Sequence, residues 1–240
     1  MLADPLERSG VSSRMNVLVI AAHPDDEVLG CGAAMARLAQ EGHQVAIAIF
    51  GEGITSRFPE REQANPEDIR QLHGNSHQVK ELLGAKELFM YSLPDNRFDT
   101  VPLLEVTKLI EGLVTKLRPE VIYTHHGGDL NIDHVVLNRA TLTATRPMAG
   151  CPVKEIYAYE VLSSTEWSFG RLEQPFAPNV FVDVSATLEH KVKAMSLYES
   201  EARIFPHPRS AEAIRNAARR WGSVIGCQAA EAFELIRAIR

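Results

Sequence analysis

Short apolar runs alternate along the chain with longer stretches whose apolar residues recur every three or four positions. The first run, residues 15–22 (MNVLVIAA), is almost wholly apolar, which predicts a strand covered on both faces. The other predicted strands are residues 44–50, 87–93, 121–126, 155–161, 179–185 and 233–239. Residues 233–239 alternate between apolar and polar side chains, which favours a strand at an edge of the sheet.

The stretches between these runs have the period of an amphipathic helix. Apolar side chains at Val28, Cys31, Met35 and Leu38 share one helical face, and this predicted helix ends near Gly42. The other predicted helices are residues 66–83, 103–117, 132–144, 186–200 and 210–220. Strands that alternate with helices in this way are typical of a parallel sheet with helices on both faces.

The pattern therefore predicts an α/β fold, a Rossmann-like three-layer sandwich with a mostly parallel central sheet. We expect residues 15–240 to form a single domain. Residues 1–14 are polar and lack the apolar core of a signal peptide, so we expect a flexible N-terminal extension. In open parallel sheets, active sites lie beyond the carboxyl ends of the strands.

Composition and charge exclude several classes of protein. The chain of 240 residues is 45% hydrophobic, enough for a substantial core, and its net charge of −6 disfavours a nucleic-acid binder. No apolar run approaches the ~20 residues of a membrane span. Three widely spaced cysteines match neither a metal site nor a disulfide framework, so the expected location is the cytoplasm.

Two polar clusters follow predicted strands at the same edge of the sheet. The first is His23-Pro24-Asp25-Asp26-Glu27, after residues 15–22; the second comprises His125, His126, Asp129, Asn131, Asp133 and His134. One His and one Asp from the first cluster, with one His from the second, would make a three-ligand site open to water, as in catalytic zinc enzymes. Two histidines and a carboxylate also bind Fe²⁺, so the residues alone leave the metal open.

The adjacent aspartates of the first cluster suit two different roles. Neighbouring side chains at a turn point in different directions, so one aspartate can bind a metal while the other exchanges protons with water and a leaving amine. The alternative is a simple turn in which an aspartate caps the following helix. Two clusters at one edge of the sheet favour the metal site.

Residues 21–45 (AAHPDDEVLGCGAAMARLAQEGHQV) resemble the opening segment of the PIG-L/LmbE family of zinc-dependent deacetylases. The signature AHPDDE is complete at residues 22–27. Residues 129–140 (DLNIDHVVLNRA) are similar to the second motif of that family, which ends in Asp-His before a helix. The resemblance covers most of residues 15–145 and is looser beyond them. It implies an LmbE-like fold and a Zn²⁺ cofactor, with Fe²⁺ or another divalent metal left open.

The resemblance also implies a role for each motif residue. His23, Asp26 and His134 would bind the metal, and Asp25 would act as general base and then general acid. Asp133 would hold a neighbouring group in place. Asn131 stands where several members carry a histidine; its amide can donate a hydrogen bond to an oxyanion but cannot titrate. His125 or His126 is the alternative donor.

The implied function is removal of an N-acetyl group from an N-acetyl amino sugar or a related glycoconjugate. The partner would be a small molecule, and a homo-oligomer is compatible with the resemblance. One alternative is a metal-dependent hydratase of an unsaturated carboxylic acid, which would use the same ligands and grip carboxylates with arginines. Another is a non-catalytic binding domain, which would have no need of Asp25.

Substrate contacts are expected from loops near the same edge. Arg57, Arg70, Arg97 and Asp99 lie in or near such loops, and Arg97 and Asp99 are favoured because PDNRFD follows a predicted strand. The segment 205–210 (FPHPRS) contains two prolines that stiffen it, so His207 or Arg209 could point into the site. The alternative for that segment is a rigid turn in which Ser210 caps a helix.

Overall fold

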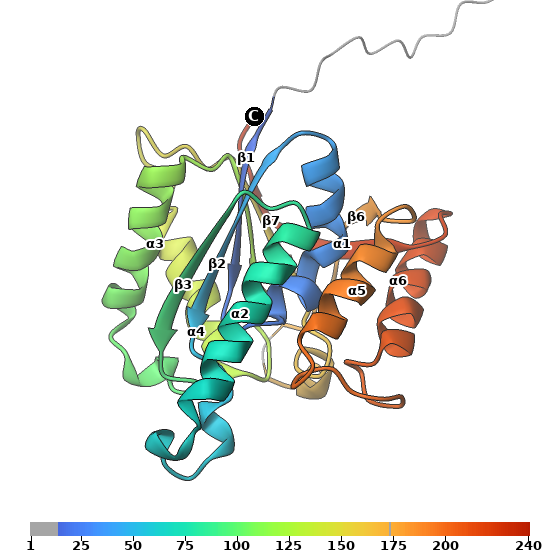
Figure 1. Cartoon of the computed structure of the whole chain (residues 1–240). Coiled ribbons are helices and arrows are strands. Elements are labelled where there is room, and N and C mark those ends of the chain that lie inside the picture. The colour runs from blue at the N-terminus through green and yellow to red at the C-terminus, as the bar shows by residue number, and fades with distance from the viewer. Residues whose placement is uncertain (1–13, 173) are drawn as a thin grey trace, which may run out of the picture.

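The computed structural model of the chain describes residues 14–172 and 174–240, whose strands form one sheet in the order β3-β2-β1-β4-β5-β7-β6 (Figure 1). Strands β1 to β5 pair in parallel, and β7 is antiparallel to both β5 and β6. The mostly parallel sheet is therefore confirmed. The strands are β1 (Asn16–Ala21), β2 (Gln44–Gly51), β3 (Glu87–Leu93), β4 (Val121–His125), β5 (Glu155–Tyr159), β6 (Val180–Asp183) and β7 (Ala230–Ala238).

Helices cover both faces of this sheet, which confirms the three-layer sandwich. One buried cluster joins α1, α2, α5 and α6 to one face, and a second joins α3 and α4 to the other. The helices are α1 (Asp26–Gln40), α2 (Pro66–Leu82), α3 (Leu103–Leu117), α4 (Ile132–Ala144), α5 (Leu188–Leu197) and α6 (Ala211–Ile225). Short 3₁₀ helices lie at Thr55–Arg57, Arg61–Gln63, Phe98–Thr100 and Glu166–Ser168.

Strand β1 shows why the central runs are apolar throughout. Val17 and Val19 belong to the core cluster on the side of α1, whereas Leu18 and Ile20 belong to the cluster on the side of α3. Successive side chains of a strand point to opposite faces, so a strand covered on both faces has no position open to water. The polar residues that follow β1 therefore begin where the strand leaves the sheet.

The prediction of an edge strand at residues 233–239 is wrong. Strand β7 lies between β5 and β6, and the edges of the sheet are β3 and β6. The first half of β7 is buried, and only its last residues alternate between half-buried and exposed positions. That alternation reflects the end of a long internal strand rather than an unpaired edge.

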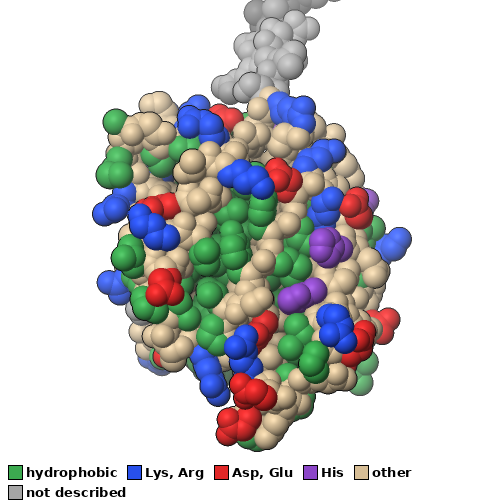
Figure 2. Space-filling model, turned by 60° about the vertical axis from the view of Figure 1, so that its left-hand side comes forward, with side chains coloured by type: hydrophobic (Ala, Val, Ile, Leu, Met, Phe, Trp, Pro, Cys, Tyr) green, Lys and Arg blue, Asp and Glu red, His purple; other side chains and the backbone are tan. Residues whose placement is uncertain are grey.

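Figure 2 brings forward the side of the molecule on which α3 lies in Figure 1, and it shows hydrophobic side chains gathered in a band between charged ones.

Helix α1 is kinked at Cys31, where φ is −146° and ψ is 26°. A kink leaves backbone groups without helical partners. The Glu231 carboxylate accepts a hydrogen bond from the N–H of Ala34 at 2.7 Å, and Lys191 Nζ donates to the carbonyl of Leu29 at 2.7 Å. Lys191 and Glu231 also pair with each other at 2.6 Å. This buried pair therefore holds α1, and the motif at its start, against α5 and β7.

Gly30 brings the first turns of α1 close to the sheet. A Cβ atom at this position would lie 2.2 Å from the ring of Tyr159 on β5. Gly30 therefore allows α1 to approach the sheet closely. At Gly32 the neighbour is the side chain of Lys191 on α5, at 3.3 Å, so this glycine lies against a helix instead.

Several predictions concern properties outside the fold itself. No helix in the described part of the chain combines the length and apolar character that crossing a membrane requires. The three cysteines are free thiols. The cytoplasmic location and the homo-oligomer stay predictions. Except for Arg14, the predicted N-terminal extension, residues 1–14, lies outside the described residues.

Candidate metal centre

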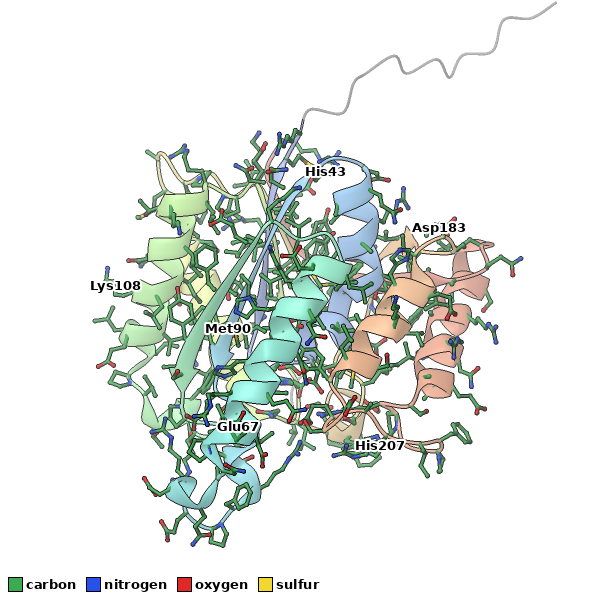
Figure 3. All side chains as sticks on the ribbon, in the orientation of Figure 1. His43, Glu67, Met90, Lys108, Asp183 and His207 are labelled. Carbon is green, nitrogen blue, oxygen red and sulfur yellow. The ribbon has the colours of Figure 1, made fainter. Side chains whose placement is uncertain are left out.

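Three side chains from the two motifs converge beyond the carboxyl ends of β1 and β4. One ligand atom each from His23, Asp26 and His134 can be chosen so that all lie within 4.8 Å of one another. Asp26 Oδ2 lies 3.3 Å from His23 Nδ1 and 3.2 Å from His134 Nε2. Figure 3 labels His207 and Glu67 at the end of the molecule where this cluster lies, and His43 at the opposite end.

The ring of His134 shows that this cluster suits a cation. It is 2% exposed, yet its Nε2 makes no well-oriented hydrogen bond with the described residues, although Asp26 Oδ2 lies 3.2 Å away. Buried polar atoms without partners are rare, because losing water without replacement is costly. A cation bound to Nε2 would satisfy one of them. Two imidazoles and a carboxylate are a donor set that zinc and iron both accept.

Asp133 fixes the orientation of His23. Asp133 Oδ2 lies 2.9 Å from His23 Nε2 and also accepts from the N–H of Asn96 at 2.7 Å. Its other oxygen accepts from the N–H of Phe98 at 2.9 Å. The carboxylate is held by backbone, so it turns Nδ1 of His23 toward Asp26. This geometry matches the holding role that the family resemblance implies for Asp133.

Asp129 holds His134 in the same way. Its Oδ1 lies 3.1 Å from His134 Nδ1, and it accepts hydrogen bonds from Ser164 and Thr165 in the loop after β5. Burial raises the pKa of Asp129, but His134 and the two hydroxyls lower it to about 2. The sequence placed Asp129 in the second cluster without a role. Its partners come from a distant loop that carries no recognisable motif.

Asp95 is a contact of His23 that the sequence analysis missed. Its Oδ1 lies 3.1 Å from His23 Nε2, so His23, Asp95 and Asp133 form a second group with metal-ligand spacing. Asp95 Oδ2 already accepts from the N–H of Ser56 at 3.0 Å. Because backbone N–H groups occupy the carboxylates of this second group, it orients His23, and the group with His134 is the better metal centre.

Asp25 lies in a strained turn beside the cluster. Its φ of 109° is in the left-handed region, which costs free energy for a residue with a side chain. The N–H of Asp25 donates to Glu27 Oε2 at 3.1 Å, and the hydroxyl of Tyr198 donates to Glu27 Oε1 at 2.6 Å. Glu27, the last residue of the signature, thus ties the turn to the end of α5. Burial raises the pKa of Glu27 to about 7.

A cavity of about 200 Å³ opens next to this turn and receives the side chains of Asp25 and Arg209. Arg209 Nη1 lies 2.9 Å from Asp25 Oδ2, and Arg209 Nε donates to Ser163 Oγ at 2.7 Å. Burial raises the pKa of Asp25 well above its usual value, and the Arg209 guanidinium opposes that rise. Asp25 is outside the group of three ligand atoms, so its carboxylate is available to a molecule in the cavity.

The 205–210 segment combines the two arrangements that the sequence left as alternatives. Arg209 points into the cavity, and Ser210 caps α6 by accepting from the N–H of Ala213 at 3.1 Å. His207 does not line the cavity. Its Nδ1 accepts from the N–H of Arg209 at 3.1 Å, and its ring packs edge-on against Trp167. His207 therefore supports the backbone that presents Arg209.

The PDNRFD turn contributes different residues from the two that the sequence favoured. Arg97 and Asp99 are exposed and do not line the cavity, whereas Asp95 and Asn96 do. The turn buries Asp95 and Phe98, and this rotates Arg97 and Asp99 toward solvent. Arg57, the other loop arginine that reaches the site, lines the cavity from the segment after β2.

Asn131 and the two remaining histidines occupy distinct environments. Asn131 lines the cavity and caps α4, because its Oδ1 accepts from the N–H of Asp133 at 2.9 Å. That bond leaves its NH₂ group for a molecule in the cavity. His125 Nε2 accepts from the N–H of Ala22 at 2.8 Å, and His126 lies 2.7 Å from Glu234. Neither histidine lines the cavity.

The family model described as GlcNAc-PI de-N-acetylase (PIG-L) matches residues 18–145. The chain belongs to the PIG-L family. Its relatives include the E. coli K12 protein YaiS, named as an uncharacterized deacetylase, with 28% identity over 73% of this chain and 85% of that protein. A probable N-acetyl-α-D-glucosaminyl L-malate deacetylase 2 of Bacillus cereus is 27% identical over 78% of this chain and 83% of its own length.

Solved structures confirm the fold of this PIG-L family member. N,N′-diacetylchitobiose deacetylase of Pyrococcus horikoshii superposes with a TM-score of 0.74 at 20% identity, covering 92% of this chain and 83% of that one. GalB, the 4-carboxy-2-hydroxymuconate hydratase of Pseudomonas putida, superposes with a TM-score of 0.72 at 17% identity, covering 94% and 98%. At these identities the likeness concerns the fold alone, since the two proteins catalyse different reactions.

Proposed function

We propose that this PIG-L family member is a zinc-dependent N-deacetylase that releases acetate from a small N-acetyl amino sugar or glycoconjugate. The convergence of His23, Asp26 and His134 beside the carboxylate of Asp25, which lies outside this ligand group, carries this proposal. The names of its relatives support it, because both YaiS and the Bacillus cereus protein are described as deacetylases.

His23, Asp26 and His134 would hold the ion. When bound, a divalent cation supplies Lewis acidity, which polarises an acyl carbonyl and lowers the pKa of water. Asp133 and Asp129 keep the two imidazoles turned toward Asp26 through contacts of 2.9 Å and 3.1 Å. Residues that orient ligands in this way prepare the site before the substrate arrives.

Asp25 performs the proton transfers in this proposal. Its carboxylate accepts a proton from the water that attacks the acetamide carbonyl and then donates that proton to the departing amine. The C–N bond breaks, and the products are acetate and a free amine. Asn131, whose NH₂ group is not used by its cap, donates a hydrogen bond to the oxyanion. Arg209 keeps the Asp25 carboxylate in place through a contact of 2.9 Å.

An acetate-release screen on the metal-loaded protein tests this function. N-acetyl amino sugars, free and nucleotide-linked, are incubated with the protein, and acetate and free amine are quantified together with metal content. We expect acetate and amine in equal amounts, loss of both after chelation, and recovery when zinc is restored. Water addition to an unsaturated carboxylic acid without acetate release would establish the hydratase instead. A protein that retains no metal and releases no acetate would contradict catalysis altogether.

A further inference from the structure

A second cavity adjoins the cavity beside Asp25, because the two share lining residues. The outer cavity has a volume of about 360 Å³ and shares Ile54, Arg57 and Leu72 with the inner one of about 200 Å³. We call the two cavities together the substrate groove. In an N-deacetylase, the acetylated sugar occupies the inner cavity, next to Asp25. The group attached to that sugar, its aglycone, then extends into the outer cavity, along α2.

The two arginines of the substrate groove face the same buried carboxylate. Arg57 Nη2 donates to both oxygens of Glu201, at 2.6 Å and 2.5 Å, and Arg209 Nη1 lies 3.0 Å from Glu201 Oε2. Arg209 also faces Asp25 at 2.9 Å. Glu201 is only 4% exposed. Both positive charges are therefore compensated within the protein before any ligand enters.

The rest of the groove lining adds negative charge. Among the described residues, four acidic side chains line the inner cavity and two more, Asp68 and Glu199, line the outer one, whereas Arg57 and Arg209 are the only arginines or lysines that line either cavity. With neutral histidines the lining carries a formal charge of −4, which one divalent cation reduces to −2. An anionic group in the outer cavity would lie close to carboxylates, which repel it. It would find no positive charge there that is not already paired within the protein.

We propose that this enzyme selects acetylated amino sugars whose aglycone carries no carboxylate or phosphate, and that Glu201 determines this selectivity. The proposal rests on the N-deacetylase function above. Arg57 could bind an anion only by leaving Glu201, and this buried carboxylate would then keep Arg209 as its remaining cationic partner, which is unfavourable because Arg209 is already shared with Asp25. Hydroxyl groups of an uncharged aglycone can instead bind to Asp68, Gln71 and Asn75 in the outer cavity without breaking any ion pair.

Two substrates that share the same sugar and linkage isolate the charge of the aglycone. One is N-acetylglucosamine α-linked to myo-inositol, which is uncharged, and the other is N-acetylglucosamine α-linked to L-malate, which has two carboxylates. We expect kcat/KM for the inositol glycoside to exceed that for the malate glycoside by at least about tenfold in the zinc-loaded wild-type protein. An equal or inverted preference would overturn the proposal.

The Glu201→Gln variant tests the assigned residue. Glutamine keeps the shape of the side chain but leaves the positive charge of Arg57 without a carboxylate partner, while Arg209 keeps its pair with Asp25. We expect the ratio of kcat/KM for the malate glycoside to that for the inositol glycoside to rise at least about tenfold. Because both rates come from the same variant, a general loss of activity cancels in the ratio. Glu105→Gln, an exposed substitution on α3 with the same change in net charge, should leave the ratio unchanged.

Binding separates this inference from the proposed function. The two deacetylated products, glucosaminyl inositol and glucosaminyl malate, are titrated calorimetrically into the zinc-loaded wild-type protein and into Glu201→Gln. If no acetate is released from any sugar, the proposed function fails. Tighter binding of the inositol compound by the wild-type protein, with a shift toward the malate compound in the variant, would still support the charge selectivity. If acetate is released but Glu201→Gln changes neither ratio nor binding preference, only the inference fails.

Discussion

The two sides of the active site are built in different ways. The metal side comprises His23, Asp26 and His134, which stand just after β1, at the start of α1 and in the first turn of α4. The loop side comprises Arg57, Glu201 and Arg209, which come from a short 3₁₀ helix and two loop segments and hold one another by ion pairs. Arg57 and Glu201 are 144 positions apart in the chain.

This difference separates the residues on which metal binding depends from the residues that can vary with the substrate. Rigid strand ends and helix starts place metal ligands accurately, and backbone N–H groups bind the carboxylates that orient them. The side chain of Arg57 is 43% exposed, and its pair with Glu201 includes none of the three residues of the metal side. We therefore expect substitutions on the metal side to abolish chemistry and those on the loop side to change the choice of substrate.

The largest effect is expected from His134→Ala, which removes one of the three ligands on the metal side. Loss of a residue that only orients a ligand lowers metal affinity about 10- to 100-fold. Loss of the ligand itself should lower metal affinity further, and acetate release should fall to background. Metal content after dialysis and acetate release measure the two effects. His207→Ala removes a histidine that lies outside the metal side, and this variant should retain the metal. Full metal content in His134→Ala would place the centre elsewhere.

Asp25→Asn should separate metal binding from proton transfer. The carboxylate lies outside the ligand group, so metal content should match that of wild type, while kcat should fall about 10²- to 10⁴-fold because the amide cannot accept the proton. Asp99→Asn is an exposed substitution that changes the net charge by the same amount, and this variant should have wild-type kcat. Near-normal hydrolysis by Asp25→Asn would refute the assigned base.

Gly30→Ala should weaken the packing beneath the metal side. The new Cβ would lie 2.2 Å from the ring of Tyr159, so either the ring or α1 must shift, at a cost of about 1–3 kcal/mol in the free energy of unfolding. Gly112→Ala in α3 meets no atom within 4 Å and should stabilise the protein by up to about 1 kcal/mol. Urea unfolding measures both. Equal stability of the two variants would contradict the close approach.

The smallest expected effect concerns His126, which lies outside both sides of the site. Burial lowers the pKa of His126, but Glu234 at 2.7 Å outweighs it, so the folded pKa lies above the ordinary value of 6.5. Protonated His126 therefore stabilises the fold below pH 6.5, and this contribution disappears as the pH rises through the raised pKa. The difference in unfolding free energy between wild type and His126→Gln should shrink over that range. A difference independent of pH would show that the pair does not act through charge.

The residue pattern alone predicted the sheet, its helices and the two motifs. Burial on both faces requires an apolar strand such as residues 15–22, and turn and cap chemistry requires the polar residues that follow it. The family signature at residues 22–27 and the Asp-His pair at 133–134 then pointed to His23, Asp26 and His134 as candidate metal ligands, and the structure brings these three side chains together. These features depend on neighbours within a few positions, so a linear pattern carries them.

Only the tertiary structure decided the internal position of β7 and the choice of Asp95 over Arg97 in the same turn. It likewise turned Arg209 inward and His207 outward, and it joined Arg57 to Glu201. Each of these outcomes depends on which distant segment lies opposite a side chain. Charge and hydropathy along the chain show which groups need a partner, but the partner itself is selected by packing in three dimensions.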